Sequence, residues 1–181
     1  FQDFIPARGF FGSDWIGLEN FRIMFAIPDT ARVLSNTIFI ALLKIIFNFI
    51  TPILFALLLN EVSNKRFKRT IQTAVYFPHF LSWVILGGMF VDLLSLNSGA
   101  INNILESLGF ERVFFLGNPS WFRKIVVITD VWKNFGFGTI VYLAAISGID
   151  PTLYEAALVD GAGRWKQTVH ITVPSIANVI V

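Results

Sequence analysis

The segment from residue 71 to residue 91 contains no Asp, Glu, Lys or Arg, and His79 is its only side chain that titrates near neutral pH. About 20 mostly apolar residues are enough for a helix to cross the hydrocarbon core of a bilayer. The composition agrees, because 55% of the residues are hydrophobic and 14% are charged, against about a quarter charged in soluble domains. The sequence therefore predicts a membrane protein surrounded by a lipid bilayer.

Three stretches predict full membrane-spanning helices, namely residues 35–59, 73–96 and 125–147. A fourth apolar stretch begins near residue 171 and runs to Val181 at the end of the chain. Because the chain starts with Phe rather than Met, we interpret it as a fragment, truncated at both ends, of one transmembrane domain covering residues 1–181. The expected fold class is all-α, a polytopic membrane helical bundle with three full spans and the start of a fourth.

The connecting segments predict how the chain crosses the membrane. Residues 60–72 and 148–170 must lie on one side, and residues 1–34 and 97–124 on the other. Four of the twelve residues from 61 to 72 are basic, and this density places that loop in the cytoplasm. On the opposite side, the apolar residues Ile101, Ile104, Leu105 and Leu108 recur at helical spacing before Gly109, which predicts a surface helix that ends there.

Ionisable and polar side chains at membrane depth are costly, so each invites a functional interpretation. Lys44 and Asn48 are four residues apart on one helical face, and Asp130 lies near Lys133 and Asn134 on another. Two interpretations of Asp130 and Lys133 stay open: part of a translocation path, or a self-neutralising pair within one helix.

Histidine and aromatic residues have similar alternatives. His79 follows Pro78, and a structural, hydrogen-bonded histidine is favoured over a proton relay. Trp83 and its aromatic neighbours offer a stacking platform for sugar rings, although packing is the default role of such residues. The candidate translocation-path residues are Lys44, Asn48, His79, Trp83, Asp130, Lys133 and Asn134.

No catalytic constellation is visible. The chain has no Cys, its two His are far apart, no Gly is followed by Lys as in a Walker A loop, and no metalloprotease motif occurs. The net charge of +2 is too small to indicate nucleic-acid binding. We therefore expect a non-enzymatic chain without a catalytic residue, metal site or cofactor of its own; if ATP drives it, another chain hydrolyses the ATP.

The segment from residue 148 to residue 174 predicts a short helix with defined ends. Asp150 suits the N-cap and Pro151 the first helical position, while Gly161 stops the helix. About two turns of helix are unstable alone, so this helix needs a surface to pack on. Small alanines at positions 156 and 157 admit close approach by a partner, and Glu155 adds an anionic contact.

Three short motifs here, Glu155-Ala156-Ala157, Asp160-Gly161-Ala162 and the four residues ending at Pro174, resemble the EAA loop of bacterial ABC importer permeases of the type I, MetI-like fold. The resemblance implies a cytoplasmic helix–turn–helix that docks into a cleft of a separate ATPase subunit. It implies that Glu155 contacts basic residues of the ATPase and that Gly161 makes the turn. An aromatic residue usual near Thr168 is missing, and Val173 replaces the usual Leu. The implied coupling residues are Glu155, Ala156, Ala157, Asp160, Gly161, Ala162, Trp165 and Pro174.

Segments outside the loop, including Asn60-Glu61, Pro78-His79-Phe80 and Trp132-Lys133, resemble the branch of these permeases that imports oligosaccharides such as polygalacturonan and rhamnogalacturonan fragments. The resemblance implies a multi-pass subunit of the bacterial cytoplasmic membrane with a sugar cargo. Implied partners are ATPase subunits that bind ATP and Mg, a second permease subunit in a heterodimer, and an extracytoplasmic solute-binding lipoprotein.

Three alternatives remain. One is an ABC permease for an amino acid, a peptide or an anion. Another is an ion-coupled secondary transporter that uses Asp130, Lys133 and His79 as a relay. The third, a membrane-embedded enzyme, is disfavoured by the absent catalytic motifs.

Overall fold

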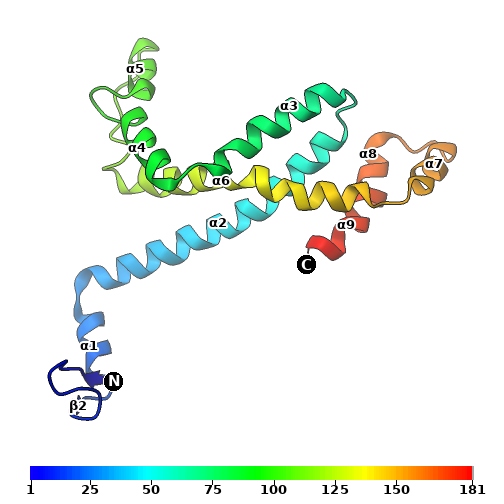
Figure 1. The fold of residues 1–181 in the computed structure, drawn as a ribbon. Coiled ribbons are helices and arrows are strands. Elements are labelled where there is room, and N and C mark those ends of the chain that lie inside the picture. Colours follow the sequence, from blue (N-terminus) through cyan, green and yellow to red (C-terminus); the bar gives the residue numbers. More distant parts are fainter. Residues whose placement is uncertain (181) are drawn as a thin grey trace. The chain divides into compact units, whose positions relative to one another are not determined.

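The computed structural model describes residues 1–180, with side chains up to residue 177. The chain divides into two compact units, residues 1–42 and 43–181, and α2 (Pro28–Asn60) runs from the first into the second (Figure 1). The predicted fourth span would extend to Val181, which lies outside the described residues.

The first unit begins with a small antiparallel pair, β1 (Gln2–Asp3) and β2 (Asp14–Trp15), followed by α1 (Glu19–Ala26). The side chain of Gln2 donates to the carbonyls of Phe10 and Ser13, and Phe1 stacks on Trp15 with ring centroids 5.8 Å apart. The all-α prediction contained no strand, because strands of two residues are too short to give an alternating apolar pattern.

The described part of the second unit consists of helices and the loops between them. It contains α3 (Lys65–Tyr76), the 3₁₀ turn η1 (Phe77–Phe80), α4 (Trp83–Leu93), α5 (Ala100–Ser107), α6 (Pro119–Ser147), α7 (Pro151–Val159), α8 (Arg164–Gln167), the π turn η2 (Thr168–Thr172) and α9 (Val173–Ile180). The cap at Asn64, whose Oδ1 accepts from the amides of Arg66 and Phe67, starts α3 inside the stretch predicted as a loop of residues 60–72. The basic residues of that stretch therefore belong to a helix.

Of the described helices, α2 alone is long and apolar enough to cross a membrane by itself. Its most apolar stretch of 18 residues has a mean hydropathy of 2.3, and helix α2 as a whole contains the predicted span 35–59. Two further candidates are bent pairs: α3–η1 with α4 at 101°, and α6 with α7 at 67°. The span predicted over residues 73–96 is thus a broken helix, since Pro78 has no amide hydrogen and Ser82 caps a new helix by accepting from the Val84 amide at 3.2 Å.

Helix α6 is central to the second unit and packs against α3, η1 and α9 (Figure 1). At Gly136 a Cβ atom would lie 2.2 Å from the carbonyl oxygen of Val75, so glycine permits the close approach of α3 and α6. Toward its C-terminal end, α6 contributes Ile146 to a small core with Ala56 of α2 and Ile176 of α9.

Much of the apolar surface of the second unit is uncovered. Ile45, Leu58 and Val84 are among many large side chains that are mostly exposed. Soluble monomers rarely leave such extensive apolar surface open to water. This surface fits contact with lipid or with further membrane helices.

Candidate functional site

Apart from Pro174, which lies in α9, the candidate residues named from the sequence fall into two groups in the second unit. The first, the polar junction, joins α2, α6, η1 and α4. The second, the helical loop, consists of α7, the turn at residues 160–163 and α8.

The polar junction starts with an ion pair between two helices. Nζ of Lys44 on α2 donates to Oδ1 of Asp130 on α6 at 3.0 Å, and Nδ2 of Asn48 donates to Oδ2 of the same carboxylate at 2.9 Å. One carboxylate therefore accepts from two side chains of α2, one helical turn apart. The alternative of a self-neutralising Asp130–Lys133 pair within α6 is wrong, because Asp130 pairs with Lys44 and Lys133 turns toward η1.

Lys133 is only 6% exposed, and its Nζ donates to the carbonyl oxygen of His79 at 2.7 Å. That carbonyl belongs to the last turn of α3–η1, where carbonyls lose their partners within the helix and the helix dipole is negative. The ammonium also lies 5.6 Å from the centre of the Trp83 ring. These contacts explain how a buried lysine is accommodated without a carboxylate partner.

His79 closes the junction. Its Nδ1 lies 3.2 Å from Oδ1 of Asn134, and its ring stacks on Phe137 with centroids 4.2 Å apart. Because Nδ2 of Asn134 donates to the Asp130 carbonyl, its Oδ1 is the acceptor facing His79, and the imidazole proton is assigned to Nδ1. His79 is thus hydrogen-bonded, as predicted, and its structural role rather than a role in a proton relay stays a prediction.

The seven candidate path residues thus form one connected set: Lys44, Asn48, Asp130, Asn134, His79, Lys133 and Trp83. Nearly all their buried polar side-chain atoms are satisfied within the set. Among the described residues, Oδ1 of Asn48 is the buried side-chain atom that lacks a partner. The contacts show that the junction joins four elements, α2, α6, η1 and α4, and a role in the translocation path stays a prediction.

Aromatic side chains around the junction mostly pack against one another. Phe135 meets Phe55 edge-on at 5.2 Å, and Phe90 meets Trp132 in the same way at 5.8 Å. Phe80 and Trp83 keep exposed faces. Packing therefore accounts for the first four rings, and a sugar platform at the other two stays a prediction.

The helical loop has the ends that the sequence predicts. Oδ1 of Asp150 accepts from the amide of Thr152 at 2.9 Å and caps α7, and Pro151 occupies the first helical position. The hydrogen bond from this amide holds the pKa of the Asp150 carboxyl below its ordinary value.

The turn after α7 is a Schellman motif. The amide of Ala162 donates to the carbonyl of Ala157 at 2.8 Å, and the amide of Gly161 donates to that of Leu158 at 3.0 Å. Gly161 has a φ of +74°, which an L side chain adopts only with strain. The structure thus gives a physical reason for glycine at the turn.

The outward face of the loop has no internal partner for its acidic residue. Glu155 and Ala156 are exposed, and within the described part of the chain the Glu155 carboxylate makes no hydrogen bond or ion pair. The loop also exposes apolar side chains: Leu158 and Val159, three and four residues after Glu155 on α7, and Trp165 on α8, which is 78% exposed. An unpaired carboxylate within an apolar surface is suited to binding a protein with complementary charge.

The remaining candidate residues of the loop are placed around this face. Asp160 lies in the turn, Ala157 and Ala162 are half-buried where the turn closes, and Pro174 lies in α9. Since a proline at position 174 cannot donate to the carbonyl four residues earlier, the preceding π turn accommodates the missing hydrogen bond.

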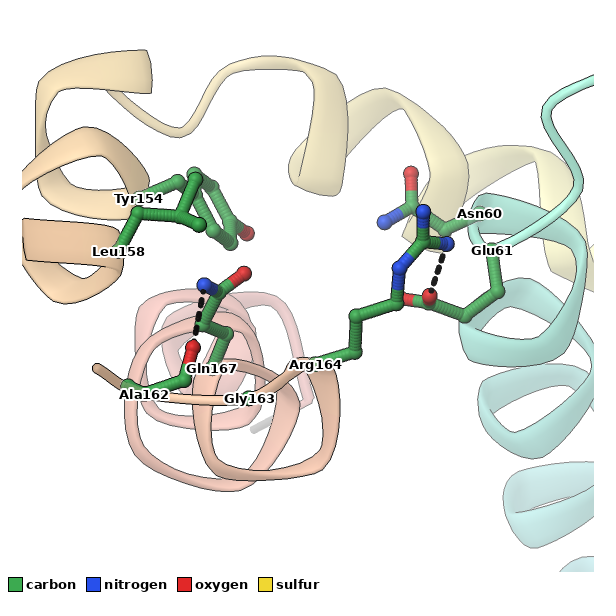
Figure 2. A pocket seen from close by; sticks show the side chains of 8 residues that line it. All are labelled: Asn60, Glu61, Tyr154, Leu158, Ala162, Gly163, Arg164 and Gln167. Atoms are coloured by element: carbon green, nitrogen blue, oxygen red, sulfur yellow. Dashed lines mark hydrogen bonds and ion pairs between the residues drawn. The ribbon is translucent and has the colours of Figure 1, made fainter.

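Contacts that were not expected from the sequence anchor the loop. Tyr154 on α7 shares a hydrogen bond of 2.9 Å with the Thr172 hydroxyl. Arg164 on α8 pairs with Glu61, beyond the end of α2, at 3.1 Å (Figure 2). A pocket of about 510 Å³ lies between these contacts, lined in part by Asn60, Leu158 and Gln167. The sequence offered one indication of the Glu61–Arg164 pair: the two residues have opposite charges and lie in loops that were predicted to share one side of the membrane.

Among the described residues, no three His, Cys, Asp or Glu side chains are grouped as metal ligands would be. The expected absence of a metal and of a bound cofactor stays a prediction.

Comparison with known proteins identifies the family. The family model for the inner membrane component of binding-protein-dependent transport systems matches residues 49–181. The chain is 46% identical over its whole length to the Bacillus subtilis polygalacturonan/rhamnogalacturonan transport system permease protein YteP, covering 56% of that protein. It is 42% identical over its whole length to Protein LplB of the same organism, covering 57% of it.

Solved structures show the same relationship. In the crystal structure of a bacterial ABC transporter that imports the acidic polysaccharide alginate, one chain matches 92% of this chain at 46% identity with a TM-score of 0.87, over 58% of its own length. A crystal structure of a bacterial alginate transporter in complex with a periplasmic protein bound to an alginate pentasaccharide matches 91% of this chain with a TM-score of 0.86. The chain thus spans a little over half the length of these relatives, and it belongs to the family of binding-protein-dependent transport system inner membrane components.

Proposed function

We propose that this chain is part of a transmembrane permease subunit of an ATP-driven ABC importer for oligosaccharides in a bacterial cytoplasmic membrane. Its family membership and the sugar polymers named for its relatives, polygalacturonan, rhamnogalacturonan and alginate, support the proposal. The chain itself has the role of a transport component, and ATP and Mg would bind to a partner ATPase.

The proposed topology has three crossings, by α2, by α3 with α4, and by α6. The ion pair between Glu61 and Arg164 supports it, because it joins the two loops that must share one side of the membrane. The basic side chains at the start of α3 support a cytoplasmic location for that side. The loop of α7 and α8 then faces the cytoplasm, where an ATPase can reach it.

The coupling site is the exposed face of α7, with Glu155 as its charged contact. The observation that carries this assignment is an unpartnered carboxylate on a short helix whose two ends are fixed by Asp150 and Gly161. Tyr154 connects α7 to the helical segment before α9 through Thr172, and α9 packs on α6. Closure of the ATPase against α7 would therefore be transmitted to α9 and α6. Movement of these helices would open the proposed cargo route alternately to the two sides of the membrane.

A second permease subunit, in a heterodimer, and an extracytoplasmic solute-binding lipoprotein complete the proposed assembly. The uncovered apolar faces of α2 and α4 support contact with further membrane helices and with lipid. The path residues are proposed to lie beside the cargo route, with the polar junction fixing the helices around it.

Co-purification tests the coupling assignment. The full-length permease is purified with its candidate ATPase as wild type, as Glu155→Lys and as Glu111→Lys. Glu111 is an exposed glutamate on the segment predicted to lie on the opposite side, so its reversal is a matched control. We expect wild type and Glu111→Lys to retain the ATPase and Glu155→Lys to lose it; retention by Glu155→Lys contradicts the assignment.

Uptake tests the transport class. Proteoliposomes that contain the whole assembly and its binding protein are expected to accumulate labelled oligogalacturonate only when ATP is enclosed. Uptake that needs a proton gradient but no ATP would favour the secondary transporter. Uptake of amino acids in preference to oligosaccharides would contradict the cargo class.

A further inference from the structure

Helix α5 has one buried polar residue, Asn102, and an exposed apolar face. Asn102 is completely buried: its Nδ2 donates to the carbonyls of Ser95 and Val113, both at 3.0 Å, and its Oδ1 accepts from the Val113 amide at 2.8 Å. A buried amide with three hydrogen bonds fixes the helix to the chain on either side of it. The interior of this segment is therefore held by polar contacts.

Arg112 adds a second set of contacts on the same side of α5. Its guanidinium donates to the carbonyls of Leu96 and Asn97 and pairs with Glu106 at 2.6 Å. Leu96 and Asn97 lie only a few residues beyond the end of α4. The segment is thus tied back to the end of α4 and does not extend away from it.

The opposite face of α5 carries only large apolar side chains. Ile101 is 38% exposed, Ile104 56% and Leu108, directly after the helix, 67%; Phe110 and Phe114 follow along the chain and are 63% and 58% exposed. In water, folding would bury such large apolar groups. Their exposure beside a buried Asn102 is stable where the surroundings are hydrocarbon.

The neighbouring start of α6 has the residues of a membrane interface. Trp121 is partly exposed, and its ring meets the buried Phe115 edge-on at 5.3 Å. Nζ of Lys124 lies 4.8 Å from the centre of the Trp121 ring. Tryptophan and lysine side by side are typical of the level at which headgroups meet the acyl chains.

We propose that α5 lies in the membrane interface on the side opposite the basic start of α3, with Ile104, Leu108 and Phe110 in the acyl region of a phospholipid leaflet. The bilayer is the occupant that the topology supplies, because α4 delivers the chain to that surface and α6 returns it, while Arg112 keeps α5 close. The inference depends on the crossings within the proposed function and is independent of the cargo. It makes α5 a fixed lateral anchor for the ends of α4 and α6.

Spin labelling tests the placement. The 181 residues contain no Cys, so single cysteines can be introduced at Ile104, Leu108 and, as the matched control, at Ser107, an exposed polar position between them. The whole transporter, with any other cysteine replaced, is labelled and reconstituted in phosphatidylethanolamine and phosphatidylglycerol. Collision rates are then measured with oxygen, which concentrates in lipid, and with a water-soluble nickel chelate.

Labels at Ile104 and Leu108 are expected to collide more with oxygen than with the nickel chelate, and the label at Ser107 to show the reverse order. High access to the chelate at all three positions overturns the proposal, because the face is then in water. Low access to both reagents at Ile104 and Leu108 also overturns it, because a protein then covers the face. ATP-dependent uptake by the same samples reports separately on the proposed function.

Discussion

The polar junction and the helical loop both contain charged side chains, but those at the junction have partners within the chain, whereas Glu155 on the loop has none among the described residues. At the junction, Asp130 accepts from Lys44 and Asn48, and the charge of Lys133 is met by a carbonyl and a ring face. On the loop, Glu155 points outward from an exposed helix without a partner among the described residues. A buried charge that is satisfied within its own chain holds helices together, whereas an exposed charge in an apolar surface is available to another protein.

This difference predicts that junction variants lower stability first and that loop variants break the complex first. The predictions below test that division, beginning with the largest effect.

Replacement of Gly136 by Ala, on α6 two residues after the junction residue Asn134, is expected to be the most damaging change. The new Cβ would lie 2.2 Å from the Val75 carbonyl oxygen, so α3 and α6 must separate, at a cost of about 3 kcal/mol. Gly88→Ala on α4 is the control, since nothing lies within 4 Å of its Cβ position. The thermal midpoint of the detergent-solubilised permease measures both; equal midpoints would show that α3 and α6 are not held in this contact.

Removal of one charge from the Lys44–Asp130 pair is expected to cost about 2 kcal/mol, because the remaining charge is left half-buried and unpaired. Asp130→Asn and Lys44→Gln should each lower the thermal midpoint. The double variant, which has no unpaired charge, should recover part of the loss. Additive losses in this double-mutant cycle would contradict a direct interaction.

Gly161→Val is expected to damage the loop and spare the junction. A branched residue at a φ of +74° costs about 1 kcal/mol and opens the turn, with little change in the midpoint of the whole permease. Loss of the ATPase in co-purification is the expected result. Gly163→Ala is the control, because its φ is −67° and nothing lies within 4 Å of its Cβ position; ATPase retention by Gly161→Val would leave the turn without a coupling role.

The smallest effect is a pH dependence of the α7 cap. The folded pKa of Asp150 lies below its unfolded value, so the ionised cap stabilises α7 above the unfolded pKa of about 4 and this contribution is lost as pH falls through the folded pKa. Hydrogen exchange at the Thr152 amide should therefore lose protection below about pH 4, beyond the intrinsic trend. Asp150→Asn keeps an acceptor without a titrating charge and should remove this dependence; an unchanged dependence would assign it to another group.

Local features of the fold were predictable from the sequence. The cap at Asp150, the turn at Gly161 and the end of α5 before Gly109 each depend on residues within one or two helical turns. Pro78 lies inside the predicted span 73–96, but the sequence did not show the bend of 101° that follows it. Its size depends on the cap at Ser82 and on Lys133, which binds the carbonyl that the break leaves free.

Pairings across the chain were not predictable. Asp130 could be paired with Lys133, three residues away, or with Lys44, 86 residues away, and only the packing of α2 on α6 decides between them. The pair of Glu61 with Arg164 likewise depends on how segments far apart in the sequence pack together. At α5, helical spacing identified the apolar face, but the sequence did not show that Asn102 would be buried or that Arg112 would pair with Glu106.

The most direct test of the account is the amount of ATPase that each permease retains at a temperature below the thermal midpoints of both Glu155→Lys and Asp130→Asn. The account predicts that Asp130→Asn, although less stable, retains as much ATPase as wild type, and that Glu155→Lys, although as stable as wild type, retains none. Loss of the ATPase by Asp130→Asn with retention by Glu155→Lys would contradict the separation of a junction that holds the helices from a loop that binds the partner.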